Sequence, residues 1–220
     1  MVQQERARVT RDKIMLGAAE VIRRVGYANA TLGDISDAAG VTKGALYFHF
    51  ESKEDIARAL VEEQHRITRV AAEDILAENA PALETMMRLC MDLAQRLTDD
   101  PIVRAGIRLT TDSSTFEAPL QDPYRDWMAM FEMLAVRAEE RGETTGEVPP
   151  NVIARFIIPA FTGVQLVSET FTGRTDLPNR VGEMWLILIH ALVASENLTD
   201  WLETVDHVFT RPRKLAGLKR

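Results

Sequence analysis

The spacing of apolar residues is the feature that most restricts how this chain can fold. Along almost all of its 220 residues, apolar side chains recur three and four positions apart, which places them on one face of an α-helix. Ile14, Ala18 and Val21, for example, share such a face within the segment 10–25. The strict alternation of apolar and polar residues that is typical of β-strands is almost absent. The sequence therefore predicts an all-α protein.

Residues that begin and end helices divide the chain into ten predicted helices. Thr31, Thr42 and Ser52 suit the position before a helix, with Asp34 completing a capping box, and Gly40 suits the position after one. The expected helices cover about residues 10–25, 31–39, 42–48, 52–76, 81–98, 102–110, 123–141, 150–173, 183–193 and 198–209.

The segment TLGDISDAAGVTKGALYFHFESKEDI, residues 31–56, has the organisation of a helix-turn-helix motif. Two short predicted helices meet at Gly40, which permits the tight turn between them. The second helix of such a motif enters the major groove of DNA with its N-terminal residues. Most of these residues are short, so the backbone can approach the bases, and one is a lysine that can reach guanine or phosphate. They are Thr42, Lys43, Gly44 and Ala45.

Further side chains of this segment carry donors that suit phosphate oxygens. They are Thr31, Tyr47, His49 and Lys53, together with the hydroxyl of Thr42. We expect Lys43, Gly44 and Tyr47 to provide most of the base discrimination, and we expect Phe48 and Phe50 to be core aromatics beneath the turn. These residues predict a three-helix DNA-binding domain at positions 1–53, with double-stranded operator DNA as its partner.

The distribution of charge agrees with this division of the chain. The net charge is −7, yet residues 1–53 hold eight Lys or Arg against six Asp or Glu, whereas residues 54–210 hold 13 against 27. This asymmetry favours contact of the N-terminal part with a polyanion. We expect the larger helical body, 54–210, to bind an effector and to dimerise, and the basic tail, 211–220, to be solvated.

Several polar and aromatic side chains of the body fall on otherwise apolar helix faces. Apolar walls with a few polar points are what a small-molecule cavity requires. The candidate ligand-binding residues are Gln64, Thr110, Trp127, Phe131, Phe161, Thr162 and Gln165. Each polar member could equally be satisfied by a neighbouring helix or a water molecule with no ligand involved. Residues 153–173 and 183–193 are so apolar that we expect a homodimer interface there, with burial inside the monomer as the alternative.

The run AGVTKGALYFHFESKEDI, residues 39–56, resembles the TetR family of regulators. The resemblance covers about residues 9–56 and implies a homodimer that binds a two-fold operator, with a divergent body that binds a small effector. Within the family, VTKGALYFHFESKE (41–54), RAGIRLTTD (104–112) and PYRDW (123–127) are most similar to receptors for γ-butyrolactone, butenolide or furan autoregulators of antibiotic-producing bacteria. Members of that subfamily use a tryptophan in the effector cavity, and Trp127 occupies the matching place.

The resemblance therefore implies a repressor of secondary-metabolite genes that is released by a small autoregulator. Two alternatives stay open. One is a TetR-type repressor of an efflux or metabolic gene that responds to another hydrophobic compound. The other is a helical enzyme or lipid carrier in which the helix-turn-helix is incidental.

Motifs of other protein classes are missing from the sequence. The single cysteine, Cys90, cannot form an intrachain disulfide, and the four histidines lack metal-ligand spacing. No GxSxG elbow or glycine-rich phosphate loop is present, so we predict no catalytic activity, no metal and no cofactor. No apolar stretch reaches the length of a membrane span, and the first residues lack the apolar core of a signal peptide. We expect a cytoplasmic protein that is nucleoid-associated when bound to DNA.

Overall fold

The computed structural model describes residues 2–111, 116 and 121–210. These residues form ten α-helices and one short 3₁₀-helix, and they contain no β-strand, which confirms the predicted all-α fold for this part of the chain. The helices are α1 (Val2–Asn29), α2 (Leu32–Ala39), α3 (Lys43–His49), α4 (Lys53–Ala77), α5 (Ala82–Asp99), α6 (Pro101–Thr111), α7 (Asp122–Glu140), α8 (Pro150–Thr172), α9 (Leu177–Leu192) and α10 (Leu198–Thr210).

The described residues pack into two compact units. The first comprises residues 2–69, 99–111 and 116, which are α1 to α3, most of α4, and α6. The second comprises 70–98 and 121–210, which are the end of α4, most of α5 and the helices α7 to α10. The functional division of the chain after residue 53 stays a prediction, because packing alone does not define which residues bind DNA or effector. The predicted basic tail, 211–220, lies outside the described residues.

The first unit is held by one apolar core to which α1, α3, α4 and α6 contribute. Ile14 and Ile22 of α1, Leu46 of α3 and Leu60 of α4 are all buried in it. Two glycines set close approaches between helices of this unit. A Cβ on Gly17 would lie 2.7 Å from the backbone N of Ala39, and a Cβ on Gly106 would lie 2.4 Å from the Cβ of Gln64. Because of these glycines, α1 lies close against α2, and α6 close against α4.

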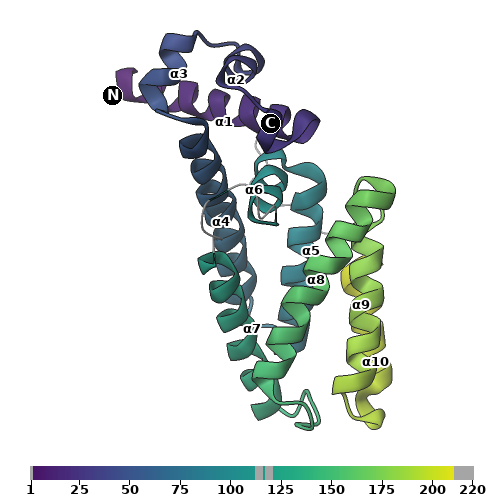
Figure 1. The fold of residues 1–220 in the computed structure, drawn as a ribbon. Helices are drawn as coiled ribbons and strands as arrows, with labels where there is room; N and C mark the ends of the chain where they lie inside the picture. Colours follow the sequence, from purple (N-terminus) through teal and green to yellow (C-terminus); the bar gives the residue numbers. More distant parts are fainter. Residues whose placement is uncertain (1, 112–115, 117–120, 211–220) are drawn as a thin grey trace. The chain divides into compact units, whose positions relative to one another are not determined.

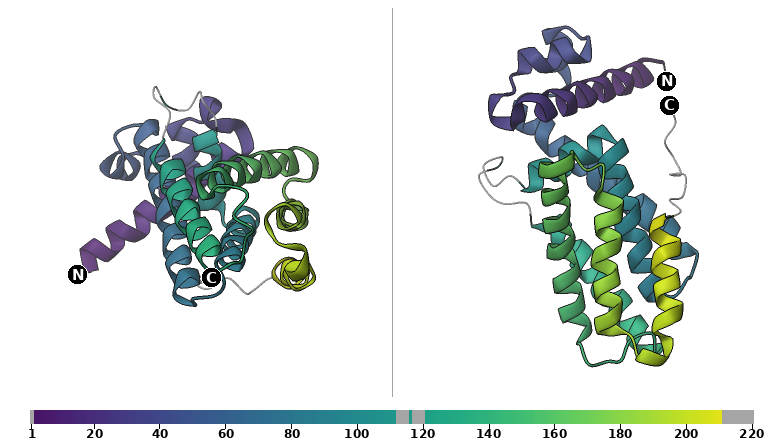
Figure 2. Two further views of the ribbon diagram at one scale, coloured as in Figure 1. Left: turned by 90° about the horizontal axis from the view of Figure 1, so that it is seen from below. Right: turned by 90° about the vertical axis from the view of Figure 1, so that its right-hand side faces the viewer.

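In the second unit, α7 packs against α8, α8 against α9 and α9 against α10. The last three helices run side by side (Figures 1 and 2). The N-terminus of α5 is capped by a side chain from the loop after α7: the Glu143 carboxylate accepts hydrogen bonds from the backbone N–H groups of Ala82, at 3.0 Å, and Leu83, at 2.9 Å. A carboxylate at this position satisfies two backbone donors and complements the helix dipole.

The connection between α8 and α9 is held by the carboxylate of Asp176. It accepts hydrogen bonds from the hydroxyls of Ser168, at 2.6 Å, and Thr172, at 2.7 Å. The Nε–H of Arg180 donates to the second oxygen, also at 2.6 Å. The hydroxyl donors and the neighbouring guanidinium together lower the pKa of Asp176 to about 2.

Two helices begin earlier than the sequence predicted. α1 starts at Val2 rather than at residue 10, because its first turns are polar and carry no apolar periodicity. It also continues to Asn29 across Gly26, whose φ of 79° interrupts the helical path. α9 starts at Leu177 rather than at residue 183, with Pro178 in its first turn, where a missing N–H costs little.

The prediction that Phe48 is a core aromatic is wrong. Its side chain is 80% exposed, whereas that of Phe50 is 5% exposed. Phe50 follows the end of α3 in an extended conformation, with φ −143°, and its ring is directed into the core. Phe48 is still within the helix and lies on the side away from Leu46, so it faces solvent.

Candidate DNA-reading face and ligand site

The two short helices of the helix-turn-helix are fixed by side-chain caps. The Thr31 hydroxyl accepts a hydrogen bond from the backbone N–H of Asp34 at 3.1 Å, and the Asp34 carboxylate accepts one from the backbone N–H of Thr31 at 3.2 Å. This confirms the predicted capping box, and the hydrogen bonds from Thr31 lower the pKa of Asp34. Gly40 ends α2 in the left-handed region, with φ 62°, and the Thr42 hydroxyl accepts from the N–H of Ala45 at 3.1 Å. The start and direction of α3 are therefore set by local contacts.

The side chains of α3 divide into a buried face and an exposed face. Leu46 is buried, and Ala45 and His49 are half-buried. Lys43, Gly44 and Tyr47 are exposed, and helical spacing places them on one outward face. The structure thus brings together three of the residues predicted to read DNA. Thr31 and Thr42 are also exposed, although their hydroxyls already take part in the caps.

Lys53 has a structural contact that the sequence did not predict. Its ammonium group donates hydrogen bonds to the carbonyl oxygens of Tyr27, at 2.9 Å, and Ala28, at 3.2 Å, and lies 4.5 Å from the centre of the Tyr27 ring. These carbonyls belong to the last turn of α1, where a positive charge is favourable. A phosphate contact of Lys53 has to compete with this site, and it remains a prediction.

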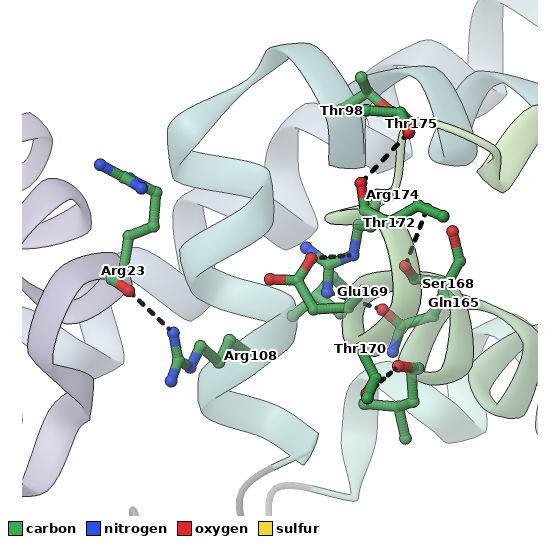
Figure 3. Close-up of polar contacts among 12 residues, drawn as sticks. Arg23, Thr98, Arg108, Gln165, Ser168, Glu169, Thr170, Thr172, Arg174 and Thr175 are labelled. Atoms are coloured by element: carbon green, nitrogen blue, oxygen red, sulfur yellow. Dashed lines mark hydrogen bonds and ion pairs between the residues drawn. The ribbon is translucent and has the colours of Figure 1, made fainter.

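A second contact of this unit joins α6 to α1 (Figure 3). The guanidinium of Arg108 donates a hydrogen bond to the backbone carbonyl of Arg23 at 3.1 Å. Arg23 lies in the last turn before Gly26 interrupts the helix, so a cation at this point complements the carbonyl end of the helix. Sequence reasoning missed this contact because the two residues are 85 positions apart.

Gln64 and Thr110 are the ligand candidates of the first unit. Gln64 is 1% exposed, and its Nε2 donates to the hydroxyl of Thr68 at 3.3 Å. Its Oε1 is buried and has no hydrogen-bond partner among the described residues. The Thr110 hydroxyl is half-buried and donates to the carbonyl of Ile107 at 2.9 Å. Gln64 therefore offers an unused acceptor, whereas the Thr110 hydroxyl proton is already engaged.

Gln165 of the second unit offers an unused donor. It is 1% exposed, and its Oε1 accepts a hydrogen bond from Arg174 at 2.7 Å (Figure 3). The Arg174 guanidinium also lies 3.2 Å from the carboxylate of Glu169. Because arginine can only donate, this contact fixes which end of the amide is oxygen. The Nε2 at the other end is buried and has no partner within the described residues.

The remaining candidates lie on α7 and α8, which pack against each other. The Trp127 and Phe131 rings meet edge to face, with centroids 6.4 Å apart. Phe131 is almost fully buried, Trp127 half-buried and Phe161 buried. The Thr162 hydroxyl donates to the carbonyl of Ile158 at 2.9 Å. Aromatic surface and one unpaired amide therefore occur on neighbouring helices of the same unit.

Cys90 is buried, and burial raises the pKa of its thiol to about 12, with a small opposing effect of the nearby Trp185 indole N–H. A thiol with so high a pKa is unreactive, which is consistent with the role of a buried apolar residue. No group of three His, Cys, Asp or Glu side chains in the described ranges could hold a metal ion.

The second unit also has an exposed apolar surface on α8 and α9. Phe171 is 76% and Ile187 72% exposed, and Phe156 and Leu186 are exposed as well. α8 is long and apolar enough to cross a membrane by length and composition alone, a test that helices of soluble proteins also pass. Large exposed apolar patches mark contact surfaces.

Two capped short helices with an outward polar face, joined to a long helix and a further helical unit, define a helix-turn-helix protein. The family model of bacterial regulatory proteins of the tetR family matches residues 14–60, and that of the tetracyclin repressor-like C-terminal domain matches residues 80–194. The chain belongs to the TetR family of bacterial regulatory proteins. The resemblance inferred from residues 39–56 is thereby confirmed.

Among its relatives is the A-factor receptor protein of Streptomyces griseus, which is 38% identical over 84% of this chain and 64% of its own length. A crystal structure of a γ-butyrolactone receptor, an ArpA-like protein, has 32% identity and a TM-score of 0.82, covering 93% of this chain and 98% of that one. CprB of Streptomyces coelicolor in complex with its biological operator sequence has 32% identity and a TM-score of 0.83, covering 94% and 99%.

Proposed function

We propose that the chain is a ligand-responsive transcriptional repressor. It binds a palindromic operator as a homodimer and is released by a small autoregulator of the γ-butyrolactone, butenolide or furan type. The genes that it controls are those of secondary metabolism and antibiotic production. As a repressor it has no catalytic activity of its own, and it works in the cytoplasm, on the nucleoid when bound to DNA.

The DNA-binding part of the proposal is supported by α3. Lys43, Gly44 and Tyr47 share its outward face, and the caps at Thr31 and Thr42 hold the helix in place. An exposed face that carries a glycine between a lysine and a tyrosine suits entry into the major groove. The similarity to CprB, whose structure contains its operator, supports the same role.

The dimer is supported by the apolar surface on α8 and α9. Side chains as exposed as Phe171 and Ile187 are unfavourable in water, and a second copy of the same surface would bury both. Two copies of this helix pair form a four-helix bundle. A two-fold dimer presents two copies of α3, which matches a palindromic operator.

The effector part of the proposal rests on one observation, the buried and unpartnered Nε2 of Gln165. A lactone ring carries a carbonyl oxygen and a ring oxygen, which only accept hydrogen bonds, so a buried N–H donor is the group needed to orient it. Trp127 and Phe131 on the neighbouring helix supply apolar surface for the rest of the molecule. The similarity to γ-butyrolactone receptors supports the same class of ligand.

Release of DNA follows from the continuity of α4. Three residues separate this helix from the end of α3, and it carries Gln64 on its buried face, against Gly106 of α6. If effector binding moves α6, α4 and with it α3 would be displaced, and the Arg108 hydrogen bond would carry the same shift to α1. Because binding of effector and binding of operator are linked through the same protein, each ligand weakens the binding of the other by the same factor.

The test is a fluorescence-anisotropy titration of a palindromic site that the protein selects from a random double-stranded library. It is run at two salt concentrations, with and without a panel of γ-butyrolactones, butenolides and furans. We expect tight, salt-dependent binding that one member of the panel abolishes. If no member of the panel releases the DNA, the proposed autoregulator is not the effector, and a repressor that responds to another hydrophobic compound is favoured. Absence of any sequence-selective binding would refute the repressor itself.

A further inference from the structure

Phe48 is an apolar side chain whose exposure the fold does not explain. It is 80% exposed, the highest value among the large exposed apolar residues of the described chain. Its ring meets that of the adjacent His49 edge to face, with centroids 5.1 Å apart. An exposed phenylalanine on a helix of seven residues is unfavourable in water unless a partner covers it.

The position of Phe48 on α3 indicates which partner that is. At 100° per residue, Phe48 lies about 100° from Tyr47 and 40° from Gly44, on the side away from the buried Leu46. Side chains in a helix lean towards its N-terminus, so the ring of Phe48 extends over the turn that contains Gly44. A Cβ added at Gly44 would meet only the Thr42 hydroxyl oxygen, at 4.0 Å. On the outward face, the open space above the Gly44 backbone is therefore bordered by the apolar ring of Phe48.

We propose that Phe48 reads a thymine of the operator through its C5-methyl group. In the major groove, thymine is the base that presents an apolar group, and the methyl distinguishes it from cytosine at the same edge. Gly44 leaves room for the base edge, and the ring removes the methyl from water. Phe48 is thus a specificity-determining residue, acting beside the polar contacts of Lys43 and Tyr47. The inference rests on the proposed binding of operator DNA.

The experiment uses the full-length dimer and the site that the wild-type protein selects from the random library. Each thymine is replaced in turn, in one half-site, by deoxyuridine, which lacks only the methyl group. The dissociation constant of every duplex is measured for the wild type, for Phe48→Ala and for Leu16→Ala. Leu16 is an exposed apolar residue of α1, so its variant controls for loss of an exposed apolar side chain in the same unit.

At one thymine we expect the wild type and Leu16→Ala to lose affinity about four-fold, the factor that corresponds to one buried methyl group. Phe48→Ala should bind the unmodified site more weakly but lose nothing further at that position. Equal losses in all three proteins at every thymine would overturn the proposal, since the ring would then touch the sugar-phosphate backbone or nothing. A wild type that selects no site at all would instead refute operator binding. Because Phe48 is exposed, Phe48→Ala should keep the melting temperature of the wild type, which a melting curve checks directly.

Discussion

Replacing Gln165 by glutamate removes one hydrogen-bond donor and leaves the shape of the side chain almost unchanged. In the wild type, the amide oxygen accepts from Arg174 at 2.7 Å and the amide nitrogen has no partner within the described residues. The variant keeps the contact with Arg174, whose positive charge also keeps the introduced carboxyl ionised. Gln165→Glu therefore presents an acceptor where the lactone carbonyl needs a donor.

The size of the effect follows from leaving a buried carbonyl unpaired. Such a group costs about 1–3 kcal/mol, which corresponds to a loss of lactone affinity of about 5- to 150-fold. Isothermal titration with the lactone that releases DNA from the wild type measures this loss. Operator affinity without lactone should stay unchanged, because Gln165 lies on α8 and not in the helix-turn-helix.

Gln121→Glu is the matched control. Gln121 lies in the same unit, and its Oε1 also accepts from an arginine, Arg125, at 2.7 Å, but its side chain is exposed. The same change of charge should there leave lactone affinity as it is. If Gln165→Glu bound the lactone as tightly as the wild type, with an unchanged melting temperature, the Nε2 of Gln165 would not be the donor and the proposed site would be wrong.

Three further changes test the framework around the site. Gly106→Ala places a Cβ 2.4 Å from the Cβ of Gln64, and thermal unfolding should show a loss of about 1–3 kcal/mol of stability; an unchanged melting temperature would mean that α4 and α6 are not in close contact. Glu143→Gln leaves one of the two N–H groups at the start of α5 without a carboxylate oxygen, and urea unfolding should show a loss of about 1 kcal/mol, whereas no loss would refute the cap. For Asp176 the hydroxyls of Ser168 and Thr172 hold the pKa at about 2, below the ordinary 3.8, so its contribution to stability is complete above about pH 4 and is lost as the pH falls towards 2. The difference in melting temperature between the wild type and Asp176→Asn should accordingly narrow over that range, and a constant difference would contradict the assignment.

Local signals were the part of the fold that could be predicted from sequence. The capping box of Thr31 and Asp34 and the left-handed Gly40 each depend on residues within four positions of one another, so their spacing is enough to predict them. The start of α9 depends instead on burial of Leu177 and Val181 against other helices, which spacing does not reveal.

The candidate site was predictable to the same extent. Helical spacing correctly placed Gln64 and Gln165 on buried faces, and both are 1% exposed. It could not supply the partner of Gln165, because Arg174 lies in the turn after α8 with a φ of 72°, a conformation that non-glycine residues rarely adopt. For Phe48 and Phe50, the pattern gave no means of telling which of two nearby aromatics faces inward at the end of a short helix. The roles of these side chains towards ligand and DNA remain predictions.

The hydrogen bond from Arg108 ends on a main-chain oxygen, that of Arg23, and not on a side chain. Any residue at position 23 supplies the same oxygen, so substitution there cannot break the contact, whereas loss of the arginine at 108 always does. Comparisons of related sequences that look for paired changes would therefore miss this contact altogether. This has a favourable consequence for protein engineering. A DNA-binding domain taken from another member of the family and joined to this body would offer Arg108 the same main-chain carbonyl oxygen, whatever residue it has at position 23.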